Sequence, residues 1–243
     1  MISFVIPAHN EEEVIANTLS LLRKGARDIP HEIILSDDGS TDATIERASG
    51  YADKVVRYQA EIPKTIGAAR NRGAREARFP ILFFLDSDVR IRNPETFFSA
   101  VLKHFESNAR LVALTVSVRV YPETETWADK LVLGFFDAYY RVANNVFGFG
   151  LTHGKCMIVR MTTFRTIGGF DEKIIASEDA DLFIRLSKRG RTILDPSLRI
   201  YFSGRRAHAI GWVPLLTRWV LNGIWIVLFK RAYSTNWDRA SSS

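Results

Sequence analysis

Short apolar runs alternate with longer stretches of helical periodicity over the first 107 residues. An apolar run predicts a β-strand, and apolar positions three to four residues apart predict a helix that buries one face. The runs that predict strands are residues 2–6, 32–36, 54–58 and 81–85. The stretches that predict helices are residues 11–24, 42–49, 66–78 and 94–107. Strands separated by helices indicate parallel βαβ units, and the wholly apolar strand at 81–85 indicates a sheet covered on both faces.

The pattern changes after residue 108, but no repeat or linker divides the chain. A long alternating strand is predicted at 111–121, followed by an aromatic-rich helix at 126–146. The other predicted elements are a strand at 157–160, a helix at 178–189 and two short closing strands at 192–194 and 198–202. We therefore expect one α/β domain over residues 1–204, with a mostly parallel central sheet flanked by helices. Ligands bind beyond the carboxyl ends of the strands in such sheets.

The composition is that of an ordinary folded protein. Of the 243 residues, 47% are hydrophobic and 25% are charged, which excludes a disordered chain, a collagen-like repeat and a multi-span membrane protein. The single cysteine, Cys156, can form neither an internal disulfide nor a cysteine-based zinc cluster. No cationic segment precedes the first apolar run, so no signal peptide is predicted. We expect the protein in the cytoplasm.

The net charge of +6 lies entirely in the C-terminal part of the chain. Residues 199–243 hold seven Lys or Arg against one acid, so residues 1–198 are net neutral. Residues 205–243 are also rich in tryptophan and predict an amphipathic helical tail. Such a tail is typical of a surface that meets anionic lipid headgroups or phosphates, or of a packed helix with solvated basic ends. Its longest uncharged run, residues 219–229, is shorter than the ~20 residues of a bilayer span, so we expect it to bind the inner face of the membrane peripherally.

Three acidic clusters carry the candidate chemistry. Asp37 and Asp38 follow a predicted strand, where two carboxylates could accept hydrogen bonds from ribose or a base, although tight turns use the same residues. Asp86 and Asp88 follow a buried strand, and their mutual repulsion favours a bound cation such as Mg²⁺ or Mn²⁺ over the alternative of a solvated turn at the strand end. The third cluster, residues 177–181, opens a helix; its acids suit either the helix dipole or a general base.

Residues 67–73 place two arginines after a group of small residues. The segment is neither a dinucleotide-binding glycine motif nor an ATP-hydrolase phosphate loop. The small residues allow close helix–sheet approach, and Arg70 could bind a diphosphate or a base.

Six segments together resemble the inverting, metal-dependent glycosyltransferases of the GT-A fold, the second family in the usual sequence classification. They occur in the family's order and are residues 5–12, 37–42, 67–73, 84–88, 168–172 and 177–182. The resemblance implies a Rossmann-like GT-A fold in which residues 1–88 bind the nucleotide and residues 89–204 bind the acceptor. The glutamine- and tryptophan-containing motif of polymer-forming members is absent from the sequence, which disfavours polymer synthesis.

The resemblance also implies which residues hold the donor. Asp86 and Asp88 match the family's Asp-x-Asp motif, which holds Mn²⁺ or Mg²⁺ with the diphosphate, and His208 is a candidate third metal ligand. The residues implied to bind the nucleotide are Pro7, Ala8, Glu11, Asp37, Asp38, Arg70 and Asp86.

The remaining implied roles concern the acceptor and the leaving group. Asp179 matches the position of the catalytic base, and Glu178 and Gly154 would face the acceptor. Arg205 and Arg206 lie where the family has a basic segment that closes over the diphosphate.

The expected reaction is inverting transfer of a sugar from a nucleotide diphosphate sugar, most commonly a UDP-sugar in this family. The candidate base favours a hydroxyl acceptor, on a glycan or a lipid-linked glycan, because a polyprenyl phosphate is already anionic and needs no base. The alternatives are a polyprenyl-phosphate glycosyltransferase of the same fold, a sugar-nucleotide nucleotidyltransferase and a non-catalytic binding module. Nucleic acid is not an expected partner, because the excess charge lies in one hydrophobic tail.

Overall fold

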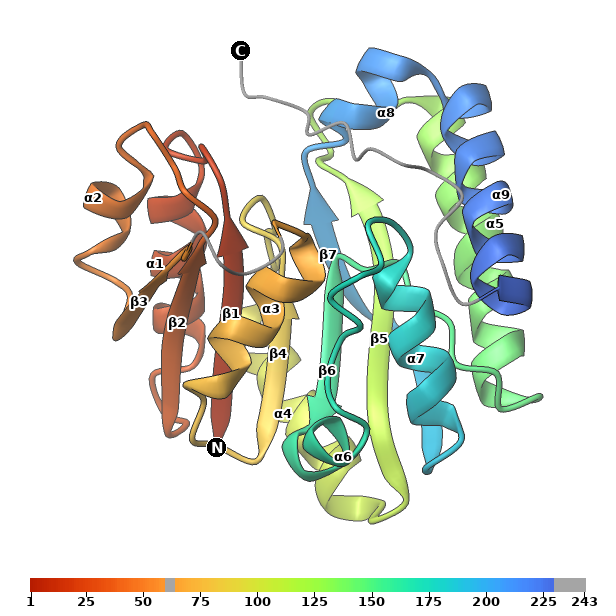
Figure 1. Cartoon of the computed structure of the whole chain (residues 1–243), viewed down its shortest axis with the longest axis horizontal. Helices are drawn as coiled ribbons and strands as arrows, with labels where there is room; N and C mark the ends of the chain where they lie inside the picture. Colours follow the sequence, from red (N-terminus) through yellow and green to blue (C-terminus); the bar gives the residue numbers. More distant parts are fainter. Residues whose placement is uncertain (60–63, 230–243) are drawn as a thin grey trace.

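A single seven-stranded sheet crosses the computed structural model, with helices on both faces (Figure 1). The structure describes residues 1–59 and 64–229. The strands are β1 (Ile2–Ala8), β2 (His31–Asp37), β3 (Lys54–Arg57), β4 (Ile81–Leu85), β5 (Leu111–Val120), β6 (Cys156–Arg160) and β7 (Arg191–Phe202). They lie in the order β3-β2-β1-β4-β6-β5-β7. The first four in this order are parallel, β6 is antiparallel to both neighbours, and β7 is parallel to β5.

The helices form two layers around this sheet and a further group beside β7. They are α1 (Ile15–Gly25), α2 (Thr44–Ala48), α3 (Ile66–Arg75), α4 (Pro94–Ser107), α5 (Trp127–Asn145), α6 (Met161–Thr166), α7 (Glu178–Ser187), α8 (Arg205–Ile210) and α9 (Trp212–Phe229). One face of the sheet packs against α1 and α4, and the other packs against α3, α6 and α7 (Figure 1). The sequence prediction of an α/β fold with a mostly parallel central sheet is confirmed.

The two faces of β1 show why the apolar runs form central strands. Phe4 points into the first layer, where its ring centroid lies 5.3 Å from that of Phe83 and 5.1 Å from that of Phe98 on α4. Val5 points to the other face, against α3. A Cβ at Gly73 would lie 2.5 Å from Val5 Cγ1, so only glycine allows α3 to approach the sheet this closely.

Two elements differ from the sequence prediction. The expected pair of closing strands is one strand, β7, which carries a register irregularity opposite Val116 and Ser117. Residues 195–197 are Asp-Pro-Ser, which interrupt the apolar alternation, so the sequence predicted two strands. In the structure the Asp195 carboxylate accepts hydrogen bonds from the Ser197 backbone N–H and from His104. Helix α6 was not expected, since six residues are too few to show a helical period.

The basic tail begins with two helices that pack on the domain. Helix α9 lies along α5 (Figure 1), and the ring centroids of Trp219 and Phe136 are 5.9 Å apart. Leu215 and Asn222 of α9 are buried. Within the described residues, no helix has the length and apolar character of a membrane span. Residues 230–243, the remainder of the predicted tail, lie outside the described residues.

Candidate functional site

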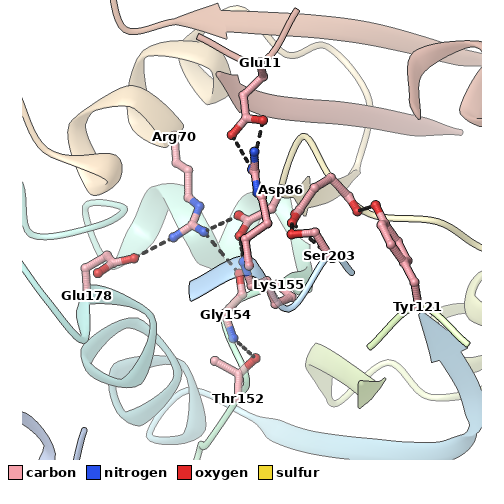
Figure 2. Close-up of polar contacts among 11 residues, drawn as sticks. Glu11, Arg70, Asp86, Tyr121, Thr152, Gly154, Lys155, Glu178 and Ser203 are labelled. Carbon is pink, nitrogen blue, oxygen red and sulfur yellow. Dashed lines mark hydrogen bonds and ion pairs between the residues drawn. The ribbon is translucent and has the colours of Figure 1, made fainter. Parts of the chain in front are cut away.

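Strand β4 ends in an acidic turn at the carboxyl edge of the parallel strands. The Asp86 carboxylate contacts two cations: Arg70 Nη2 lies 3.0 Å from Oδ1, and Lys155 Nζ lies 2.8 Å from Oδ2 (Figure 2). Lys155 reaches Asp86 because it directly precedes β6, whose Cys156 pairs with Leu85 in β4. Burial opposes the charge of Lys155, but Asp86 and Asp88 outweigh it and raise its pKa, so Lys155 stays protonated.

Hydrogen bonds from Ser203, the residue that follows β7, hold the Asp88 carboxylate in place. Its Oδ2 accepts hydrogen bonds from the Ser203 hydroxyl at 2.5 Å and from the Ser203 backbone N–H at 3.3 Å. Its backbone carbonyl accepts a hydrogen bond from the Tyr121 hydroxyl (Figure 2). Burial alone would raise the pKa of Asp88, but the Lys155 charge and the Ser203 hydrogen bond lower it. Asp88 is therefore a buried carboxylate that remains ionised.

Arg70 joins this turn to the start of α7. Its Nη1 donates to Glu178 Oε1 at 2.6 Å, and its Nη2 donates to the Gly154 carbonyl at 3.1 Å as well as to Asp86. Burial would lower the pKa of Arg70, but Asp86 and Glu178 raise it. The guanidinium is thus a fixed, buried cation shared by residues far apart in the sequence (Figure 2).

Helix α7 opens on two adjacent carboxyls, the buried Glu178 and the half-buried Asp179. Ser177, just before the helix, adopts a left-handed conformation with φ 64°, which is uncommon for a residue other than glycine. Asp179 lies directly against the Gly154 backbone: a Cβ at Gly154 would be 2.4 Å from Asp179 Oδ2, and the φ of Gly154 is +73°. Burial is the main cause that raises the pKa of both Glu178 and Asp179, against the opposing charge of Arg70.

Tyr140 of helix α5 lies near Gly154 and Asp179. The Tyr140 ring centroid lies 4.8 Å from that of His153, the residue before Gly154. Burial, followed by the charge of Asp179, raises the pKa of Tyr140. His153 Nε2 lies 2.8 Å from the Asp137 carboxylate of the same helix. Asp179, at the start of α7, therefore lies near both the Gly154 backbone and Tyr140 on the inner side of α5.

The ends of β1 and β2 form the expected nucleotide side, beside Pro7. Asp37 accepts hydrogen bonds from the Gly39 and Ser40 backbone N–H groups at 3.0 and 3.2 Å, which is the turn role that the sequence left open. The Asp38 N–H donates to the Ala8 carbonyl at 2.8 Å, and the Asp38 carboxylate lies 3.2 Å from Arg72 Nη2.

Arg72 is a site residue to which the sequence analysis gave no role. It is buried beneath Tyr58, whose ring centroid lies 5.6 Å from the Arg72 guanidinium carbon. Its spacing of two residues from Arg70 was the available signal, but only the fold shows that it contacts Asp38.

The basic segment of α8 reaches the site through Arg205. Arg205 Nη2 lies 2.9 and 3.0 Å from the two Glu11 oxygens, and burial raises the pKa of Glu11 despite this ion pair. Arg206 is half-buried beside it. His208 does not join the aspartates: its Nε2 lies 2.9 Å from Asp129 Oδ2 at the start of α5. The expectation that His208 is a third metal ligand is therefore not supported, because α8 directs it toward α5.

The acidic turn fits a divalent ion only in part. Carboxylate oxygens are suitable ligands for Mg²⁺ and Mn²⁺, which commonly take one or two carboxylates together with substrate phosphates. Among the described residues, no group of three His, Cys, Asp or Glu side chains is arranged to hold a metal. Asp86 and Asp88 could therefore supply two ligands at most, and a substrate diphosphate would have to supply others.

The mixed sheet, with an acidic turn after β4 and an acidic start of α7, defines a GT-A fold. The structure is similar to the mannosyltransferase PcManGT from Pyrobaculum calidifontis, solved with GDP-Man and Mn²⁺: the TM-score is 0.65 at 18% identity, covering 83% of this chain and 56% of that one. It is also similar to glucosyl-3-phosphoglycerate synthase from Mycobacterium tuberculosis, solved with Mn²⁺, UDP-glucose and phosphoglyceric acid. That TM-score is 0.62 at 17% identity, covering 94% of this chain and 78% of the other.

The sequence comparison gives the family. The model of glycosyl transferase family 2 matches residues 3–168, and the chain therefore belongs to this family. The succinoglycan biosynthesis protein ExoA of Rhizobium meliloti is 26% identical over 216 residues, 86% of this chain and 65% of that protein. The dolichol-phosphate mannosyltransferase of Pyrococcus furiosus is 33% identical over 92 residues, 36% of this chain and 26% of that protein. The chain thus spans less than two thirds of either relative's length.

Proposed function

We propose that this protein is a metal-dependent, inverting glycosyltransferase that moves a sugar from a nucleoside diphosphate sugar to an acceptor hydroxyl. The observation that carries the proposal is the bridge made by Arg70. Its guanidinium contacts Asp86, the candidate diphosphate and metal site, at 3.0 Å and Glu178, the neighbour of the candidate base, at 2.6 Å. One fixed cation thus joins the donor side to the acceptor side. Family membership and the nucleotide sugars bound by proteins of similar fold support this proposal.

The proposed donor pocket lies at the ends of β1 and β2. Asp37 and Asp38 would bind the ribose or base beside Pro7 and Ala8, with UDP as the first candidate nucleotide. Asp38 is already oriented by Arg72, at 3.2 Å. Glu11 is proposed to act here by holding Arg205 close to the pocket.

The leaving diphosphate would be stabilised by the cations around the acidic turn. Charge would develop on its oxygens as the bond between the anomeric carbon of the sugar and the diphosphate oxygen breaks, and fixed cations stabilise that charge without reorganisation. Arg70 and Lys155 are already fixed by Asp86, and Arg205, with Arg206 beside it, would cover the diphosphate from α8. A divalent ion held by Asp86 and Asp88 would supply Lewis-acid stabilisation of the same oxygens.

Asp179 would act as the general base. The acceptor hydroxyl attacks the anomeric carbon from the face opposite the diphosphate, which inverts the configuration, and its proton passes to the Asp179 carboxylate. A pKa raised by burial makes this carboxylate a stronger base than an exposed aspartate. Glu178 and the Gly154 backbone adjoin Asp179 and would contact the acceptor.

The test is a donor screen that measures nucleoside diphosphate release from UDP-, GDP- and dTDP-sugars, with Mn²⁺, Mg²⁺ or EDTA and a panel of glycan acceptors. We expect metal-dependent release with one nucleotide, and its loss in Asp88→Asn. Asp28→Asn, at an aspartate whose side chain is 83% exposed, is the matched control and should leave release unchanged. Equal release with EDTA would contradict the metal requirement. The absence of release with every donor, together with the absence of nucleotide binding, would contradict the proposal itself.

A polyprenyl-phosphate glycosyltransferase is the second candidate, and the name of the Pyrococcus furiosus relative favours it. The two candidates differ in their need for a base. A hydroxyl acceptor requires Asp179 to take a proton, so Asp179→Asn should reduce kcat by ~10²–10⁴-fold. A phosphate acceptor is already ionised, so the same variant would retain most of its activity.

A further inference from the structure

Helix α5 exposes an apolar stripe along its whole length. The stripe repeats every three or four residues, so at about 100° per residue its members occupy one side of the helix. We define the outer α5 stripe as Trp127, Leu131, Phe135, Tyr139, Val142 and Val146, which is the first residue beyond the helix; these side chains are 76%, 51%, 66%, 53%, 47% and 72% exposed. The opposite side of α5, which includes Leu133, is buried. An amphipathic helix normally exposes its polar side, whereas α5 exposes a run of apolar side chains and buries both of its acids, Asp129 and Asp137.

The apolar surface extends onto neighbouring elements. Phe147 and Phe149, just beyond α5, are 67% and 65% exposed. Between α5 and α9 lies a hollow bordered by apolar side chains alone, namely Leu131, Val132, Phe135, Phe136, Leu216 and Val220. The two helices lie side by side at one edge of the molecule (Figure 1). A contiguous exposed apolar surface of this kind marks an interaction site.

The exposed charges of α5 and α9 have one sign; Glu125, just before α5, is half-buried, and its carboxylate lies 3.9 Å from Lys130 Nζ. In the described parts of α5 and α9, the exposed ionisable groups besides Tyr139 are Lys130, Arg141 and Arg218, all cationic. Both acids of α5 point inward: Asp129 accepts hydrogen bonds from Thr126 and Trp212, among others, and Asp137 from Arg119 and His153. A second copy of this chain would bring cations against cations, whereas an anionic bilayer offers both the negative charge and the apolar depth that the surface requires.

We propose that the outer α5 stripe and the adjoining side of α9 form a docking face for an anionic lipid surface. Helix α5 lies in the plane of the headgroups, with its aromatic and aliphatic side chains inserted and Lys130 and Arg141 at the level of the lipid phosphates. Aromatic residues and cations are enriched at this depth of a membrane.

The docking face lies directly behind the candidate base. Tyr139 in the stripe and Tyr140 are adjacent on α5, with tilted rings whose centroids lie 5.6 Å apart, and the Tyr140 centroid lies 4.8 Å from that of His153, the residue before Gly154. The thickness of helix α5 thus separates the docking face from the groups beside Asp179. The inference about the acceptor rests on the proposed function. If the docking face holds the protein on the bilayer, the acceptor is an amphiphile whose polar hydroxyl reaches Asp179 while its apolar part stays in the bilayer.

The test is sedimentation of the full chain with vesicles of phosphatidylcholine alone or mixed with phosphatidylglycerol. We expect binding to the anionic vesicles that weakens at high salt. Phe135→Ser/Tyr139→Ser should weaken it at least tenfold. Lys130→Glu/Arg141→Glu should also weaken it at least tenfold, since each basic residue near an anionic surface contributes about 1 kcal/mol. The charge-matched control is Lys103→Glu/Arg110→Glu, at exposed residues on and after α4, and it should bind like the wild type.

Two results would overturn the docking face: wild-type protein that does not sediment with anionic vesicles, and variants that sediment as the wild type does. A concentration-dependent dimer that Phe135→Ser/Tyr139→Ser dissociates would assign the face to a second copy instead. Far-UV circular dichroism and the unfolding temperature verify that each variant is folded. Nucleotide binding, measured by calorimetry without lipid, reports on the proposed function separately, so either idea can fail alone.

Discussion

Lys155 is expected to compete with a divalent ion for the acidic turn after β4. Its Nζ lies 2.8 Å from Asp86 Oδ2, where it occupies one side of a carboxylate that would have to ligate the metal. An ion bound to that oxygen at the ~2.1–2.5 Å typical of Mg²⁺ and related ions would lie roughly 4–5 Å from the ammonium group. A double and a single positive charge at that distance repel by about 2 kcal/mol even at a dielectric constant of about 80.

Replacing the lysine by an uncharged side chain of similar length removes this repulsion. Lys155→Met should therefore bind Mn²⁺ about 30-fold more tightly than the wild type in the absence of donor. Turnover should fall in the same variant, because Lys155 is also one of the cations placed to stabilise the diphosphate. The measurement is electron paramagnetic resonance of unbound Mn²⁺ during titration of the protein, repeated with UDP.

The control is Lys103→Met, which removes an exposed lysine from α4 and should leave Mn²⁺ binding unchanged. Equal Mn²⁺ affinity in Lys155→Met and the wild type would refute the competition. If neither protein binds Mn²⁺ or Mg²⁺, even with UDP, the metal requirement of the proposed reaction is wrong, which is a separate result.

Three further predictions concern the acceptor side and α8. Gly154→Ala should lower kcat, because the new Cβ would lie 2.4 Å from Asp179 Oδ2 and would displace that carboxylate; it should also lower the unfolding temperature. The control is Gly134→Ala, at a position in open space on α5, which should not destabilise the protein. The pH profile of kcat/KM should fall toward acid through a pKa above the ordinary aspartate range, because Asp179 must be ionised to accept a proton and burial raises its pKa; an acid limb within the ordinary aspartate range would contradict the assignment. His208→Ala should leave Mn²⁺ binding unchanged. It should lower the free energy of unfolding, measured with urea, by about 1 kcal/mol, because the hydrogen bond to α5 is lost. Weaker Mn²⁺ binding would instead show that His208 is a metal ligand.

The parallel half of the fold could be predicted because its signals are local. Apolar runs such as residues 81–85 are long enough to mark strands, and parallel strands direct the acids that follow them to one edge. Which side of a helix is buried depends on residues that are distant in the sequence, so local patterns do not show it. The exposed side of α5 carries a run of apolar side chains, whereas its buried side includes Asp129 and Asp137, so periodicity alone cannot show which side packs on the domain.

The partners of the acids were also beyond the sequence. Lys155 and Ser203 belong to no recognisable motif, and they reach Asp86 and Asp88 only because β6 lies beside β4 and β7 ends near the acidic turn. His208 shows the opposite error: the resemblance implied a metal ligand at this position, but Arg205 and His208 of α8 contact different parts of the structure. Arg205 reaches Glu11, and His208 reaches α5.

The cations of the site are oriented before any donor binds. Arg70 and Lys155 are each held by Asp86, at 3.0 and 2.8 Å, and Arg205 by Glu11, at 2.9 Å. Because each cation is already paired, a diphosphate would have to share or replace a carboxylate partner, which would reduce the affinity for any single small anion. In the proposed reaction the benefit would lie in the transition state, where the positive charges would need no reorganisation as negative charge accumulates on the leaving group. Arg70 additionally contacts Glu178, so a shift of this guanidinium toward the diphosphate would weaken its hold on the acceptor side and couple donor binding to the environment of Asp179.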